Sequence, residues 1–121
     1  MDIVKLQETA SWLREKFQSK PKIGIVLGSG LGAFAQRITE EASFNFSDIP
    51  HFSAPSVEGH GGRLIIGSLQ GKPLIALQGR VHYYEGHSME AVAFPIRVLA
   101  LLGIQNLILT NSAGGLGDTM R

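Results

Sequence analysis

Apolar residues recur along the chain with characteristic spacings, and these spacings predict its secondary structure. Between residues 3 and 17 they are three or four positions apart, which is typical of a helix with one buried face. Asp2 is placed to cap the start of this helix, and Pro21 follows its end. Residues 22–27 form a short apolar run that a glycine stops, which is typical of a buried strand. The chain is therefore expected to begin with a helix followed by a buried strand.

The rest of the chain continues this alternation. Two apolar runs separated by a Gln-Gly-Lys turn predict a β-hairpin, and the long apolar stretch after Ser88 predicts a buried helix that bends at Pro95. The expected elements are a short helix at 31–38, an edge strand at 41–46, hairpin strands at 64–69 and 73–78, a helix at 88–102 and a buried strand at 106–111. This order predicts an α/β fold with a mixed, largely parallel central sheet flanked by helices.

The composition argues against several classes of protein. Hydrophobic residues make up 44% of the 121 residues, which argues against disorder and suits one modest domain. Eleven basic residues face ten acidic ones, and a net charge of +1 argues against nucleic acid or an anionic membrane as a partner. The absence of cysteine excludes disulfides and a thiol nucleophile, and no histidine spacing suits a metal ion. Because no signal peptide or spanning segment is visible, we expect a cytoplasmic protein.

Glycine is over-represented, and much of it lies in loops that follow predicted strands. Three such loops, at residues 28–32, 79–82 and 111–115, each come directly after a strand. Ligands of open α/β sheets bind beyond the carboxyl ends of the strands, so these loops could converge on one site. Glycine amides, serine hydroxyls and an arginine guanidinium all suit an oxyanion. The loops therefore predict a site for a small anion, although each one alone could be an ordinary turn.

The loop from Arg80 to His87 holds the densest group of functional side chains. It contains a guanidinium, two imidazoles, two phenols and a carboxylate within eight residues. An aromatic ring beside polar groups can cover a sugar or a base while its neighbours hold an anion. His60, set between glycines in a loop at 58–62, is a further candidate. The histidines, His51 among them, could equally be ordinary loop residues.

Four motifs in these loops resemble those of the trimeric purine nucleoside phosphorylases. They are LGSGLG at 27–32, GHGGRL at 59–64, QGRVHYYEG at 78–86 and TNSAGG at 110–115. The resemblance runs in order from about Trp12 to Leu116, which is nearly the whole chain. Four ordered motifs are more specific than any one glycine loop. In this interpretation residues 1–121 are the N-terminal portion of a nucleoside phosphorylase domain, and its C-terminal portion is absent.

The resemblance implies a reversible phosphorolysis of a purine ribonucleoside or deoxyribonucleoside, with phosphate as co-substrate and no cofactor or metal. It implies a catalytic role for His60, His82 and Glu85, and a ribose contact for Tyr84. The implied phosphate ligands are Ser29, His60, Arg80, His82 and the backbone of Ser112. The base-binding residues would lie beyond Arg121, so we expect the chain alone to be inactive. A homotrimer is also implied, with no nucleic acid or membrane as partner.

Two other hypotheses stay open at this point. The first is a dinucleotide-binding module of the Rossmann type, because residues 28–33 satisfy G-x-G-x-x-A and Asp48 follows about twenty residues later. This hypothesis leaves the loops that contain Arg80 and Asn111 without a role. The second is a non-catalytic fragment that only binds phosphate.

Overall fold

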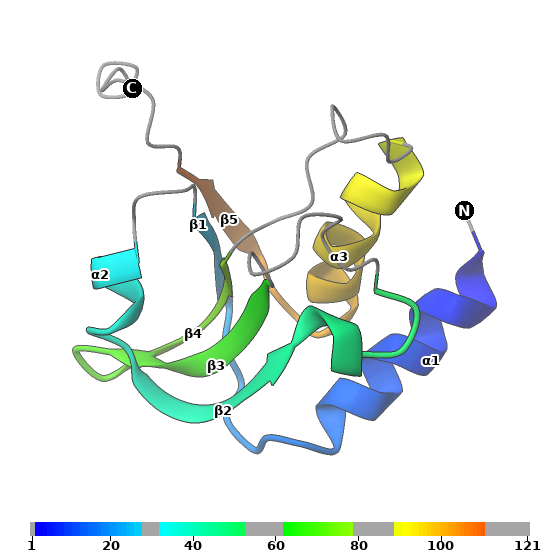
Figure 1. Cartoon of the computed structure of the whole chain (residues 1–121). Helices are drawn as coiled ribbons and strands as arrows, with labels where there is room; N and C mark the ends of the chain where they lie inside the picture. The colour runs from blue at the N-terminus through cyan, green and yellow to red at the C-terminus, as the bar shows by residue number, and fades with distance from the viewer. Residues whose placement is uncertain (1, 28–31, 53–61, 79–88, 111–121) are drawn as a thin grey trace.

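Five strands form one sheet in the computed structural model, which describes residues 2–27, 32–52, 62–78 and 89–110 (Figure 1). The order of the strands across the sheet is β2-β3-β4-β1-β5. The elements along the chain are α1 (Ile3–Arg14), β1 (Ile23–Leu27), α2 (Gly32–Ala35), β2 (Thr39–Asn45), the 3-10 turn η1 (Phe46–Asp48), β3 (Arg63–Leu69), β4 (Lys72–Gln78), α3 (Met89–Leu101) and β5 (Asn106–Leu109).

The sheet is mixed, and its parallel part is the part nearest β5. Strand β1 pairs in parallel with β4 on one side and with β5 on the other. Strand β3 pairs antiparallel with β2 on one side and with β4 on the other, so the described sheet has two parallel and two antiparallel pairings. The expected α/β fold with a mixed sheet flanked by helices is therefore confirmed, but the described sheet is only half parallel and not largely parallel.

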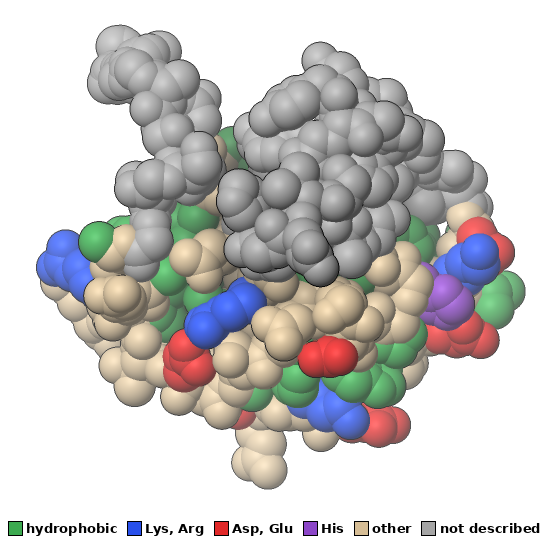
Figure 2. Space-filling view, in the orientation of Figure 1, with side chains coloured by type: hydrophobic (Ala, Val, Ile, Leu, Met, Phe, Trp, Pro, Cys, Tyr) green, Lys and Arg blue, Asp and Glu red, His purple; other side chains and the backbone are tan. Residues whose placement is uncertain are grey.

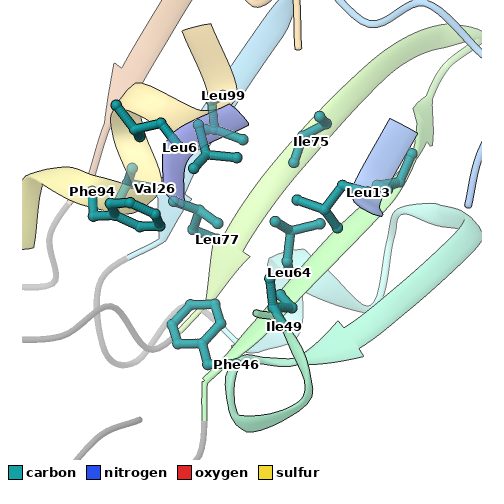
Figure 3. Packing of buried hydrophobic residues seen from close by; sticks show 12 residues of the cluster. Leu6, Leu13, Val26, Phe46, Ile49, Leu64, Ile75, Leu77, Phe94 and Leu99 are labelled. Atoms are coloured by element: carbon teal, nitrogen blue, oxygen red, sulfur yellow. The ribbon is translucent and has the colours of Figure 1, made fainter. Parts of the chain in front are cut away.

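Helices cover both faces of the central strands. Helices α1 and α3 pack on one face, where Leu13, Leu99 and Leu64 belong to one buried cluster (Figure 3). Helix α2 packs on the other face, where Ala35 and Ile65 belong to a second cluster. Strands covered on both faces need apolar side chains at nearly every position, which explains the continuous apolar runs in β1, β3 and β4.

Helix α1 begins where the sequence predicts and ends earlier. The side chain of Asp2 accepts hydrogen bonds from the backbone N–H groups of Val4 and Lys5, at 3.0 and 3.2 Å. The helix ends at Arg14, so Phe17 packs against the core from beyond the helix end. Ile3 was expected on the buried stripe, but its side chain is 64% exposed. Ile3 lies in the first turn, beyond the contact with the sheet.

Two turns show why the chain reverses where it does. Gln70 and Gly71 both have positive φ, at 53° and 82°, as the two-residue turn of a hairpin requires. At the end of α3, Gly103 has a φ of 103°, its N–H donates to the carbonyl of Ala100, and the N–H of Ile104 donates to that of Leu99. This arrangement is a Schellman motif, which satisfies the last carbonyls of a helix and turns the chain toward β5.

Three expectations need correction. Strand β5 was expected to be buried, but all four of its residues are exposed, because β1 is its only neighbour among the described strands. Helix α3 was expected to be buried, but Arg97, Ala100 and Leu101 face solvent in its last turns. Helix α2 is also shorter than the predicted 31–38, because the chain turns at residues 36–37 to enter β2.

Candidate functional site

The strands that precede the three predicted anion-binding loops end side by side. Leu27, the last residue of β1, is paired with Gln78, the last residue of β4. On the other side of β1, Val26 is paired with Leu109, the last residue of β5. Immediately beyond β5, the N–H and the hydroxyl of Thr110 both donate to the carbonyl of Val26, at 3.0 and 2.7 Å. The three loops therefore start from adjacent points on one edge of the sheet.

The segment that contains His60 returns to the same edge. It ends at Gly62, and the next residue, Arg63, is the first of β3 and is paired with Gln78. The carbonyl of Gly62 also accepts a hydrogen bond from the N–H of Phe46, at 2.8 Å, which ties this point to the end of β2. All four segments that carry the recognised motifs are thus attached to this one edge, which we call the site edge (Figure 1).

The predicted site residues themselves lie outside the described residues. They are Ser29, His60, Arg80, His82, Tyr84, Glu85 and Ser112. Their attachment points are described, and these lie together at the site edge. The roles of the individual side chains stay predictions.

A charged residue that the sequence analysis did not single out lies at the site edge. Arg63 belongs to the GHGGRL motif, and its Nη2 donates to Oε2 of Glu40 at 2.8 Å. Its Nε is buried and has no hydrogen-bond partner among the residues that the structure describes. The strand register places Arg63 in one row with Asn45 and Gln78, so this row is polar. The sequence could have pointed to Arg63, because this arginine follows two glycines and lies at the amino end of a strand.

The segment before residue 53 is anchored to α1. The hydroxyl of Thr9, which is fully buried, donates to the carbonyls of Lys5 and Pro50, at 3.0 and 2.8 Å. The next residue, His51, has a φ of 68°, and its Nε2 lies 2.8 Å from Oε1 of Glu8. These contacts hold the chain just before the segment that contains His60. His51 has a structural contact here, in line with the alternative of an ordinary loop histidine.

Few other features of the described residues point to chemistry. Glu41 accepts hydrogen bonds from the N–H of Gln18 and the hydroxyl of Ser19, both at 2.7 Å, and these donors lower the pKa of its carboxyl. They tie β2 to the turn after α1. The described part of the chain holds no cluster of three or more potential metal ligands and no helix long and apolar enough to cross a membrane. Charges of both signs are interspersed over the visible face (Figure 2).

The topology does not fit the dinucleotide-binding alternative. In a Rossmann unit the acidic residue ends a parallel strand beside the strand that precedes the glycine loop. Here Asp48 lies in η1, after β2, which is antiparallel to its neighbour and separated from β1 by β3 and β4. Asp48 is therefore two strands away from the position that ribose recognition requires.

Comparison with known proteins agrees with the family that the four motifs resemble. Residues 22–121 match the family described as the phosphorylase superfamily, and the chain belongs to this superfamily. It is 45% identical to purine nucleoside phosphorylase 1 of Geobacillus stearothermophilus over 98% of this chain and 43% of the relative. It is 47% identical to the purine nucleoside phosphorylase of Anopheles gambiae, over 96% of this chain and 33% of the relative.

Solved structures show the same relation. The purine nucleoside phosphorylase of Schistosoma mansoni in complex with acetate superposes with a TM-score of 0.85 at 41% identity. A purine nucleoside phosphorylase in complex with ribose-1-phosphate superposes with a TM-score of 0.86 at 40% identity. In each case 98% of this chain and 43% of the other chain are covered. The chain thus spans less than half the length of the relatives that it matches.

Proposed function

We propose that this chain supplies the phosphate- and ribose-binding part of a purine nucleoside phosphorylase. The observation that carries the proposal is the adjacency of the carboxyl ends of β4, β1 and β5. This adjacency attaches three predicted phosphate-binding segments to one edge of the sheet, and the segment that contains His60 joins them there. The printed names of the relatives and the ribose-1-phosphate complex of one of them support the same assignment.

The proposed reaction is displacement at the anomeric carbon of a purine nucleoside. A phosphate oxygen forms a bond to C1′ while the bond from C1′ to N9 breaks, and the electron pair of that bond leaves with the purine, which takes up a proton. Positive charge develops on the sugar as the bond lengthens. A phosphate held beneath the ring both stabilises this charge and is positioned to attack, so positioning and electrostatics supply most of the rate.

We assign the parts of this chemistry as the motifs suggest. Ser29, Arg80 and the backbone of Ser112 would hold the phosphate. His82 and His60 would donate to it, with His60 also near the ribose. In the same assignment Tyr84 contacts the ribose and Glu85 holds the geometry of the phosphate site. No cofactor is required by this reaction, because phosphate itself is the nucleophile.

We expect the 121-residue chain alone to form only part of such an enzyme. It spans 33–43% of the relatives, and residues that recognise the purine are expected in the remainder. We therefore expect the isolated chain to bind phosphate and to show little or no phosphorolysis of inosine. We propose that the complete protein would be a homotrimeric, cytoplasmic enzyme of purine salvage.

Titration of phosphate into the 121-residue chain tests the assignment. Arg80→Ala should weaken phosphate binding by about tenfold to a hundredfold, since a charge-assisted hydrogen bond contributes roughly 1.5–3 kcal/mol. Arg97→Ala is the matched control, because Arg97 is exposed on α3 and should leave the affinity unchanged. Equal phosphate affinity in the wild type and in Arg80→Ala would contradict the site, and substantial inosine turnover by the isolated chain would contradict the incompleteness.

A further inference from the structure

Three phenylalanines form a chain of ring contacts beside the site edge. The ring of Phe52 meets those of Phe46 and Phe94, with centroids 5.4 and 6.1 Å apart and interplanar angles of 65° and 84°. These are edge-to-face contacts, which aromatic side chains favour. Phe46 and Phe94 belong to the same buried cluster as Val26 and Leu77, each of which lies one residue before the end of its strand (Figure 3). The three rings therefore lie at the end of the sheet where the site edge is.

Two consecutive turns bring Phe52 back onto Phe46. The N–H of Ile49 donates to the carbonyl of Phe46 at 3.1 Å, and the N–H of Phe52 donates to the carbonyl of Ile49 at 3.2 Å. Each bond closes a four-residue turn, whose first and last Cα atoms lie less than about 7 Å apart. Phe46 and Ile49 are buried, and Phe52 packs partly buried against the same cluster. The spacing of three between these apolar residues is thus what stacks them on one side.

Phe46 holds both ends of the segment that contains His60. This segment, residues 53–61, begins directly after Phe52, whose ring packs on the ring of Phe46. It ends directly before Gly62, whose carbonyl accepts a hydrogen bond from the N–H of Phe46 at 2.8 Å. The start and the end of the segment are therefore attached to one buried residue.

Phe52 also connects this segment with the one that contains Arg80. Residues 79–88 lie between the last residue of β4 and the first residue of α3, and Phe94 lies in the second turn of α3. The contact between Phe52 and Phe94 thus joins the start of one predicted phosphate-binding segment to the helix that follows the other. Such contacts affect function because a shift of about 1 Å in a reacting group can cost roughly a hundredfold in rate.

We propose that Phe52 is a positioning residue of the phosphate site. Through its contacts with Phe46 and Phe94 it sets the place of His60 relative to Arg80, and so the strength with which the site binds phosphate. Phe52 touches no substrate and acts through His60. The proposal rests on the proposed function, which makes His60 and Arg80 phosphate ligands, and it adds a residue that none of the recognised motifs contains.

Titration of inorganic phosphate into four forms of the 121-residue chain tests the proposal. They are the wild type, Phe52→Leu, His60→Ala and the double variant. We expect Phe52→Leu to weaken binding about threefold to tenfold, which is part of what a hydrogen bond to a charged group contributes. In the His60→Ala background the same substitution should have no effect, because a residue that acts through another gives a non-additive loss. Phe52→Tyr keeps the ring and should restore the affinity of the wild type.

Phe44→Leu is the matched control. Phe44 is also a partly buried phenylalanine with an edge-to-face contact, in this case to Trp12 at 5.3 Å and 68°. Urea unfolding should show a loss of stability in both leucine variants, and phosphate affinity should change only in Phe52→Leu. If Phe52→Leu does not fold, Phe94→Leu removes the same contact from the side of α3 and should weaken phosphate binding in the same way.

The outcomes separate this proposal from the proposed function. Unchanged phosphate affinity in Phe52→Leu would overturn the positioning role, and so would a loss of the same size in the His60→Ala background. An equal loss of affinity in Phe44→Leu would also overturn it, since the effect would then follow stability alone. A wild-type chain that binds no phosphate, or that binds it equally well as Arg80→Ala, would instead contradict the proposed function, and the positioning role would fall with it.

Discussion

Two leucines on either side of Val26 meet very different surroundings. Leu77 in β4 and Leu109 in β5 are both paired in parallel with Val26, each from its own side of β1. Leu77 is 2% exposed, and Leu109 is 62% exposed. Both are leucines paired with the same residue of β1, so the difference in exposure comes from what lies on the outer side of each strand. Beyond β4 lie β3 and β2, and beyond β5 no described strand follows.

This difference shows that the burial of an apolar strand depends on what lies on its outer side as well as on its own sequence. Buried apolar surface stabilises a protein by about 25 cal/mol per Å² only when water is removed from it. Leu77 makes that contribution within this chain, among residues contributed by α1, α3 and the sheet (Figure 3). Leu109 leaves most of its surface in water, so it makes little of this contribution.

The largest expected effect separates these two leucines directly. Leu77→Ala removes a buried side chain and leaves a cavity, so it should lower the free energy of unfolding by about 2–5 kcal/mol. Leu109→Ala should change it by no more than about 0.5 kcal/mol, as exposed substitutions do. Urea unfolding followed by the fluorescence of Trp12, the single tryptophan, measures both values. Equal losses in the two variants would show that β5 is buried in the isolated chain in solution.

Two glycines test how much room the sheet leaves for an added methyl group, one beside β2 and one beside β5. A Cβ added at Gly67 would lie 2.2 Å from the carbonyl oxygen of Thr39, which β2 holds in place beside the bulge. Gly67→Ala should therefore cost roughly 1–3 kcal/mol of stability, the usual range for overpacking. At Gly24 the three atoms nearest to the added Cβ would be methyl groups of Leu99, Ile104 and Leu107, at 3.1–3.2 Å.

Gly24→Ala is thus the matched control for the substitution in β3. Leu107 lies in the exposed strand, where its side chain has room to move, so the loss of stability should be clearly smaller than in Gly67→Ala. Thermal unfolding of both variants beside the wild type compares them. A larger loss at Gly24 would mean that β5 is held as rigidly as the centre of the sheet.

Local signals made much of this fold predictable. Asp2 marked the start of α1, and the Gln-Gly-Lys turn marked the hairpin, because capping and turn geometry depend on a few adjacent residues. The exposure of β5 was not predictable from its sequence, because burial depends on what lies beyond the strand. The predicted helix ran past the observed end of α1, because the periodic apolar pattern continues as far as Phe17 in the segment that follows the helix.

The site was predictable to the level of strand ends and no further. Glycine loops after apolar strands indicated a shared edge, and the pairings of Leu27, Gln78 and Leu109 confirm that the strand ends are adjacent. The contact between Arg63 and Glu40 was out of reach, because it depends on the register of β2 across a bulge. A register of that kind is set by long-range pairing and leaves no periodic trace in the sequence.

The smallest expected effect concerns β2, the edge strand that is held by polar contacts and has little buried apolar surface. The donors Gln18 and Ser19 lower the pKa of Glu41, so its ionised form stabilises the folded state. This contribution is fully present above the pKa of the unfolded chain and is lost as the pH falls through the lower pKa of the folded state.

Because the carboxylate is exposed, we expect Glu41→Gln to cost only about 0.2–1 kcal/mol at pH 7. The difference from the wild type should shrink as the pH falls from 7 toward 3. Urea unfolding at several pH values measures this, with Glu15→Gln, an exposed glutamate after α1, as control. A difference that stays constant with pH would show that the attachment of β2 does not depend on this charge.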